Sequence, residues 1–145
     1  MEQRELKFRA WSKLAKCMLI PDALDFELAS FRGHRLQDPN LSGSGHLKNL
    51  ILMQYTGLKD STGKEIYEGD VVYFKYNAGH VVESFGVVRF GKYLSAYNKF
   101  EEAVYVQGFY ISQCYKGNED YQHFDMFDNK YTIRGNIYEN PELVK

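Results

Sequence analysis

The chain has 145 residues, the usual size of one domain, which is enough to bury a core without disulfides or a structural metal. Its 18 basic and 19 acidic residues leave a formal net charge of −1, so no global field attracts it to nucleic acid or to an anionic membrane. Aromatic residues make up 16% of the chain, a composition that favours β-sheets and contact surfaces.

The first predicted strand covers residues 6–11, where apolar and polar side chains alternate. Residues 13–16 indicate a turn, and residues 17–20 can return as a hairpin partner that we expect Pro21 to close. The apolar positions of residues 22–31 fit both a period of two and a helical stripe, and we favour a strand there.

The next stretch, residues 33–48, has few aliphatic side chains and a Ser/Gly run at 42–45, so we expect a loop or a connection between lobes. The apolar run at 49–55 predicts a strand. Residues 60–63 then predict a tight turn, in which the Asp60 carboxylate bonds the turn backbone and a glycine takes positive φ.

The second half of the chain reads as strand after strand. Strands are predicted at 71–76, 81–90, 103–110 and 131–138. We expect four glycines to bend this sheet or to form bulges in it: Gly79, Gly86, Gly91 and Gly108. A short helical turn is expected within 93–102, and a protruding polar loop at 117–129.

These elements predict a mainly β fold, with α+β as the alternative. We expect a single domain over 1–145, divided into an N-terminal mixed lobe, 1–60, and a C-terminal curled sheet or small barrel, 61–145.

The two cysteines, Cys17 and Cys114, are far apart and form no CxxC motif, which is typical of a reducing compartment. The first nine residues are charged and lack the apolar segment of a secretory signal, and no later run reaches membrane-spanning length. We therefore expect a cytoplasmic protein without a membrane partner.

Several sequence blocks resemble one protein family. They are 7–11 (KFRAW), 53–60 (MQYTGLKD), 63–72 (GKEIYEGDVV) and 135–143 (GNIYENPEL). In this order they closely resemble the YopX family of phage and prophage proteins. The resemblance implies a small cytoplasmic protein encoded by a bacteriophage or prophage, with some SH3-like character in its C-terminal lobe. It implies no catalytic residue. Residues 93–129 carry no family motif, so a function specific to this member could lie there.

Three patterns suggest chemistry and are outweighed by structural readings. Residues 86–92 satisfy most of a P-loop expression, but Tyr93 replaces the Mg²⁺-binding Ser or Thr and the stretch favours a strand. The histidines lack metal-ligand spacing: His34, His46, His80 and His123. An acidic cluster lacks EF-hand spacing: Glu119, Asp120, Asp125 and Asp128. The sequence therefore predicts no catalytic, cofactor-binding or metal-binding residues and no cofactor, and we do not expect an enzyme.

Two surfaces could bind macromolecules. Basic residues near the start are interleaved with Phe8 and Trp11 and could grip phosphates: Arg4, Lys7, Arg9, Lys13 and Lys16. The alternative is an edge strand whose lysines prevent pairing. Tyrosines in the second half could line a peptide groove or serve as packing: Tyr73, Tyr76, Tyr105, Tyr110 and Tyr115.

We expect a non-catalytic phage accessory protein that binds a host or phage protein and can form a homo-oligomer. Nucleic-acid binding through the basic strand or the barrel surface is the alternative.

Overall fold

A computed structural model describes residues 5–77, 79–97, 103–113, 123–126 and 130–144. It consists of antiparallel β-sheets with two short 3₁₀-helices, so the predicted mainly β class is confirmed. The chain divides into two compact units, Met1–Tyr55 and Thr56–Lys145. No helix in the described ranges is long and apolar enough to cross a bilayer.

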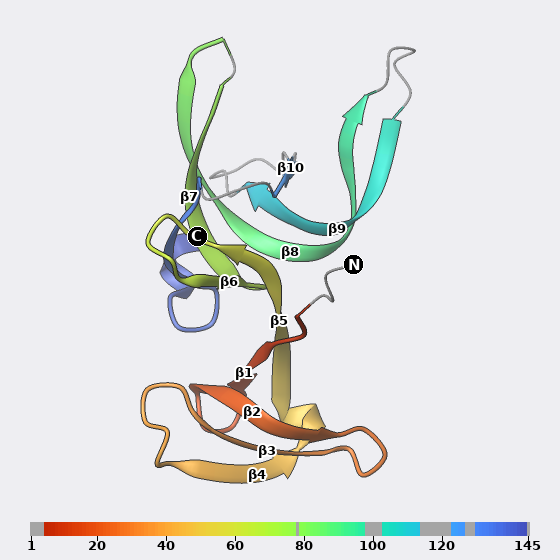
Figure 1. Cartoon of the computed structure of the whole chain (residues 1–145), viewed down its shortest axis with the longest axis vertical. Helices are drawn as coiled ribbons and strands as arrows, with labels where there is room; N and C mark the ends of the chain where they lie inside the picture. The colour runs from red at the N-terminus through yellow and green to blue at the C-terminus, as the bar shows by residue number, and fades with distance from the viewer. Residues whose placement is uncertain (1–4, 78, 98–102, 114–122, 127–129, 145) are drawn as a thin grey trace. The chain divides into compact units, whose positions relative to one another are not determined.

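The first unit is coloured red to yellow in Figure 1. Its elements are β1 (Phe8–Ser12), β2 (Cys17–Asp25), β3 (Ser30–Arg35), β4 (Ser42–His46), the 3₁₀-helix η1 (Leu47–Asn49) and the first part of β5 (Leu50–Lys59). Four strands follow one another as a meander, and β5 returns beside β1, giving the order β4-β3-β2-β1-β5. The buried side chains of Ala10, Met18, Leu50 and Met53 supply its core.

The second unit begins within β5, whose last residues pair with β6 (Glu65–Tyr67). It continues with β7 (Asp70–Asn77), β8 (Val81–Tyr97), β9 (Ala103–Gln113), β10 (His123–Asp125), β11 (Thr132–Asn136) and the 3₁₀-helix η2 (Pro141–Val144). The order of its large sheet is β10-β9-β8-β7-β11 (Figure 1). One core cluster lies here: Ile66, Val72, Phe74, Val88, Ile111 and Tyr131.

The predicted turn at 60–63 is confirmed. Asp60 Oδ1 accepts hydrogen bonds from the backbone N–H of Thr62 at 2.8 Å and of Lys64 at 3.0 Å, and Gly63 has a φ of +88°. The strand predicted at 71–76 is also confirmed as part of β7. Both of its faces carry buried or half-buried side chains, as the alternation indicates.

The loop predicted at 33–48 is wrong, because this stretch completes β3 and forms all of β4 and most of η1. All five residues of β4 are exposed, so no apolar alternation marks the strand. Its pairing with β3 depends on the main chain, and Ser30 to His34 match His46 to Ser42 in register. Backbone hydrogen bonding here outweighs the low strand propensity of glycine.

Pro21 was expected to end its strand, but β2 continues past it to Asp25. Pairing of β2 with β1 covers only Cys17 to Leu19, so Pro21 lies beyond it and interrupts no hydrogen bond to β1. On the other side, Pro21 matches Gly33, and the register shifts between Pro21 and Ala23. The residues that fit both periods, 22–31, form two strand segments around a turn at 26–29.

Two expectations in the second unit are corrected. Residues 93–97 belong to β8 and do not form a helical turn, because they pair with β9; residues 98–102 lie outside the described ranges. Within the loop predicted at 117–129, residues 123–125 pair with β9 as β10, and 117–122 and 127–129 lie outside the described ranges.

Candidate functional site

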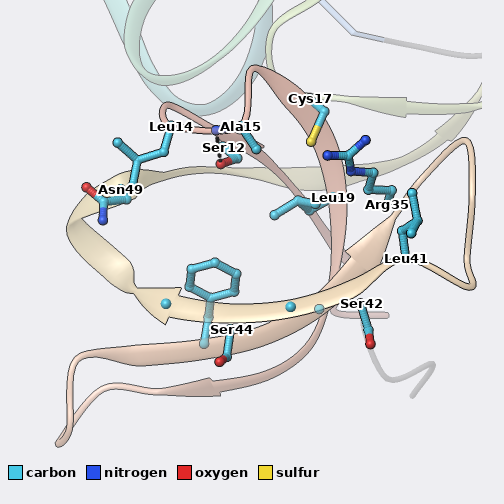
Figure 2. Close-up of a pocket in the computed structure, with 14 residues that line it drawn as sticks. Ser12, Leu14, Ala15, Cys17, Leu19, Arg35, Leu41, Ser42, Ser44 and Asn49 are labelled. Atoms are coloured by element: carbon cyan, nitrogen blue, oxygen red, sulfur yellow. Dashed lines mark hydrogen bonds between the residues drawn. The ribbon is translucent and has the colours of Figure 1, made fainter.

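A pocket of about 350 Å³ lies entirely within the first unit (Figure 2). Its residues come from β2, β3 and β4, from the end of β1 and the turn at 13–16, and from η1 and the connection before β4. They are Ser12, Leu14, Ala15, Cys17, Leu19, Phe31, Gly33, Arg35, Leu41, Ser42, Gly43, Ser44, Gly45 and Asn49. This volume is at the small end of the range for ligand pockets.

The floor of the pocket is built from glycines, which strand geometry places on one face. Gly43 matches Gly33 across the β3–β4 pair, and Gly45 matches Phe31. Because side chains alternate along a strand, Gly43 and Gly45 share the face of Phe31, whereas Ser42 and Ser44 belong to the other face. Figure 2 accordingly shows the hydroxyls of Ser42 and Ser44 directed away from the hollow.

The glycines differ in what surrounds them. A Cβ on Gly43 would meet no atom within 4 Å, so it would enter the open pocket. A Cβ on Gly45 would come within 2.9 Å of the Phe31 ring, and one on Gly33 would come within 2.6 Å of the Ile20 carbonyl oxygen. The Phe31 ring therefore covers Gly45, and the open floor is at Gly43.

One side-chain and two backbone hydrogen bonds hold the rim of the pocket in place. The Ser12 hydroxyl accepts from the Ala15 N–H at 3.0 Å, and the Lys13 N–H donates to the Asn49 carbonyl at 2.9 Å. At the other end the Arg35 N–H donates to the Leu41 carbonyl at 2.9 Å. These bonds tie the turn at 13–16 to η1 and the connection before β4 to the end of β3.

The lining is mostly apolar, with a single charge. Leu14, Leu19, Phe31 and Leu41 supply large apolar side chains, and Leu14 and Leu41 remain 75% and 49% exposed. Arg35 is the one charged residue of the lining. Figure 2 shows it at the end of the pocket where Leu41 lies, with Asn49 at the opposite end.

None of the sequence patterns that suggested chemistry forms a site within the described residues. The P-loop-like stretch is a continuous part of β8. His34 Nδ1 lies 2.9 Å from an Asp22 oxygen, and His46 Nδ1 accepts from the Lys48 N–H at 3.1 Å. No group of three potential metal ligands occurs in the described ranges. Cys114 and the side chains of His123 and of the acidic cluster at 119–128 lie outside them.

The basic residues near the start do not line an edge. β1 lies between β2 and β5, so the edge-strand alternative is wrong. Lys7 forms an ion pair with Glu5 at 3.0 Å, and Lys13 Nζ donates to the Lys48 carbonyl at 2.7 Å. Both of these lysines therefore have local protein partners, and Arg4 lies outside the described ranges.

The tyrosines of the second unit do not gather into one groove within the described residues. Tyr73 and Tyr76 belong to opposite faces of β7: Tyr76 packs on the core with its ring 6.0 Å from that of Phe74, and Arg134 lies over Tyr73 at 5.4 Å. Tyr110 stacks on Tyr93 at 4.6 Å. Tyr115 lies outside the described ranges.

An ion pair borders the outward face of β7. Lys75 Nζ lies 2.7 Å from Glu83 Oε1, and the two residues match across β7 and β8. Hydrogen bonds from Lys75 and Tyr73, together with the Lys75 charge, hold the pKa of Glu83 below its ordinary value, and Glu83 in turn raises the pKa of Lys75. The three side chains form a local polar cluster.

The paired strands β8 and β9, drawn as a long ribbon in Figure 1, also carry exposed aromatic side chains. Phe90 and Phe109 match directly across the strands, with ring centroids 5.0 Å apart, and Phe90 is 45% exposed. Lys92 lies 4.9 Å from the ring centre of Tyr105, which is 58% exposed. These four residues are called the ribbon face below.

The sequence matches the family described as YopX protein over residues 7–145. The chain belongs to the YopX family. It is also similar to the crystal structure of protein EF1440 from Enterococcus faecalis, with a TM-score of 0.54 and 21% identity over 99% of this chain and 100% of that one. This second likeness concerns the fold alone. No curated protein matches the sequence.

The sequence blocks that indicated the YopX family contain none of the pocket residues, which lie between 12 and 49. Sequence reasoning missed the pocket because it assigned residues 33–48, which hold half of the lining residues, to a loop or a connection between lobes. A usable signal was present, since Ser and Gly alternate strictly at 42–45 and alternation is the period of a strand.

Proposed function

We propose that this YopX-family chain is a non-catalytic, phage- or prophage-encoded accessory protein that binds a segment of a host or phage protein in the pocket of its first unit. The observation that carries the proposal is the mostly apolar pocket, with an open floor at Gly43 and with Leu14 and Leu41 exposed at its rim. Membership of the YopX family, with the phage association that the sequence resemblance implies, supports the biological setting.

The chemistry of the lining suits recognition of a polypeptide. Binding pockets are typically apolar with a few placed polar groups, and here these are Ser12, Cys17, Arg35 and Asn49. A fixed rim lowers the entropy lost on binding, because few side chains or loops have to become ordered. The edge of β4 beside the pocket presents main-chain groups to which an extended segment could pair.

The same lining supports a non-catalytic role. The described residues that form the pocket include no carboxylate and no imidazole, the groups that most often transfer protons in enzymes. The lining is better suited to holding a side chain than to reacting with one.

The proposal can be tested by selecting displayed random peptides on the immobilised full chain. Gly43→Leu should abolish enrichment, because its side chain would fill the pocket while its Cβ clashes with nothing. Gly108→Leu is the matched control, since a Cβ at Gly108 also meets no atom within 4 Å and Gly108 is in the second unit, not among the pocket residues. Equal enrichment by Gly43→Leu and the original chain would reject the pocket as the binding site.

The ribbon face favours a second candidate function, binding of single-stranded nucleic acid. Exposed aromatic rings can stack with bases while Lys92 contacts phosphate. Binding should then weaken steeply between about 50 and about 200 mM salt. Lys92→Glu should abolish binding and Lys64→Glu, on an exposed turn of the same unit, should not. Absence of binding at low salt would reject this candidate.

A further inference from the structure

We infer that the pocket of the first unit recognises the free C-terminus of its partner protein, with the last apolar side chain on the glycine floor and the terminal carboxylate on Arg35. The inference rests on the proposed function and specifies its ligand. Three features support it: the charge of Arg35, the spacing between Arg35 and the glycine floor, and the exposed edge of β4.

The charge of the pocket calls for an anion. Arg35 is its one charged residue, and within the described ranges its guanidinium forms no ion pair. Guanidinium groups bind carboxylates through two parallel hydrogen bonds, which gives both strength and a defined orientation. The Arg35 backbone is itself held by the bond from its N–H to the Leu41 carbonyl.

The distance between Arg35 and the glycine floor suits the carboxylate and the side chain of a single C-terminal residue. Arg35 and Gly33 are two residues apart on one face of β3, which is about 7 Å along the strand. A C-terminal residue carries its carboxylate and its apolar side chain on one Cα, so the two can reach adjacent parts of the pocket. An internal Asp or Glu uses its own side chain for the carboxylate and leaves the apolar floor unfilled.

The edge of the sheet offers the remaining contacts. β4 is the last strand in its sheet order, and its five residues include no Lys and no Pro, the residues that commonly block pairing at an edge. The residues that precede the terminus could pair with this edge as an added strand. C-terminal carboxylate capture and strand addition are both established modes of peptide recognition.

The test uses two hexapeptides of one sequence, Gly-Ser-Ala-Ser-Ala-Leu, one with a free C-terminal carboxylate and one with a C-terminal amide, titrated into the full chain by calorimetry. The acid should bind at least about tenfold more tightly than the amide, because a hydrogen bond to a charged group is lost with the amide. Arg35→Gln should remove this difference. Arg32→Gln is the matched control, as Arg32 is on the same strand but on the opposite face.

A second readout uses Cys17, which lines the pocket. In a Cys114→Ser background the acid peptide should slow alkylation of Cys17, and octanoate should protect it far less. Protection by octanoate as strong as by the peptide would overturn the inference in favour of a small carboxylate ligand.

The remaining outcomes separate the inference from the proposed function. If displayed peptides are enriched through the pocket but acid and amide bind equally, the terminal-carboxylate inference is wrong and the protein-binding function stands. If the free chain dimerises and Gly43→Leu abolishes the dimer, the occupant is a second copy and the inference is overturned. If Gly43→Leu alters no enrichment, the proposed function itself fails.

Discussion

Asp60 joins two segments that are far apart in the chain. Its Oδ1 accepts from the Thr62 N–H, the Thr62 hydroxyl and the Lys64 N–H, and its Oδ2 accepts from the Ile133 N–H at 3.1 Å. Only 4% of the residue is exposed. Burial alone would raise the pKa of this carboxyl, but the hydrogen bonds from Thr62, Ile133 and Lys64 outweigh burial and lower it.

We predict that Asp60→Asn destabilises the second unit by about 2 kcal/mol near neutral pH. Either orientation of the amide turns its NH₂ toward a backbone N–H, so at least one donor is left facing a donor. Urea unfolding followed by circular dichroism measures the change. Asp38→Asn is the control, because the Asp38 carboxylate accepts a single, longer bond of 3.2 Å, from the Asn40 N–H at an exposed turn.

The pH dependence of this difference has a defined sign. The pKa of Asp60 is lower in the folded chain than in the unfolded chain, where it is about 3.9. The stabilisation is therefore complete above that pH and is lost as the pH falls through the folded pKa. The difference in free energy of unfolding between the original chain and Asp60→Asn should shrink as the pH falls from about 5 to about 2. A difference that grows over this range would contradict this account.

The contacts of Asp60 show which interactions of one residue can be predicted from the sequence and which cannot. Asp60 and Gly63 predict the turn because their requirements are local, an Asx hydrogen bond and a positive φ. The bond from Ile133 lies 73 residues away and depends on how β11 reaches the turn. No local pattern reports such a contact.

Glycines in the ribbon of β8 and β9 have unequal roles. A Cβ on Gly86 would collide with Ile111 Cγ2 and lie 2.8 Å from the Ser112 carbonyl oxygen, whereas one on Gly108 would meet no atom within 4 Å. In β8 the register shifts between Leu94 and Ala96 and not at Gly86 or Gly91, so neither glycine forms a bulge, and the alternative that they bend the sheet stays a prediction. Gly86 permits close packing of neighbouring strands.

We predict that Gly86→Ala destabilises the chain by about 1–3 kcal/mol, because Ile111 belongs to the core cluster and has to move. Gly108→Ala should be neutral or slightly stabilising, since alanine restricts the unfolded chain more than glycine does. Thermal unfolding of both variants makes the comparison. Similar losses in the two would show that backbone freedom, and not space at Ile111, requires these glycines.

The strands that could be predicted from the sequence are those in which apolar and polar side chains alternate. β1, β7 and β8 bury one face at least in part, and their apolar periods predicted them. β4 buries no residue, so the floor of the candidate site was assigned to a loop. The pocket depends on glycines and serines that hydrophobic patterning does not weigh.

The two units share one topology without a detectable sequence repeat. In each, four strands form a meander and a fifth pairs with the outer side of the first, as β4-β3-β2-β1-β5 and β10-β9-β8-β7-β11. Each unit also has buried apolar residues of its own, such as Met18 in the first and Ile66 in the second. This order follows from antiparallel pairing of successive strands, which many sequences can satisfy.

Separate cores predict separate responses to core mutations. Trp11 is the single tryptophan and belongs to the first unit, so its fluorescence reports unfolding of that unit. Ile66→Ala should destabilise the second unit by about 2–5 kcal/mol and leave the Trp11 transition unchanged. Met18→Ala should shift the Trp11 transition and leave the remaining circular dichroism transition in place.

The strand β5 could couple the unfolding of the two units, because its residues belong to both of them. If either variant shifts both transitions together, the whole chain unfolds as one cooperative body. If the transitions separate, the C-terminal peptide proposed as ligand should raise the midpoint of the Trp11 transition alone, since a ligand stabilises the folded unit that binds it. Gly43→Leu should cancel that rise and Gly108→Leu should preserve it, which links the stability of the first unit to occupation of its pocket.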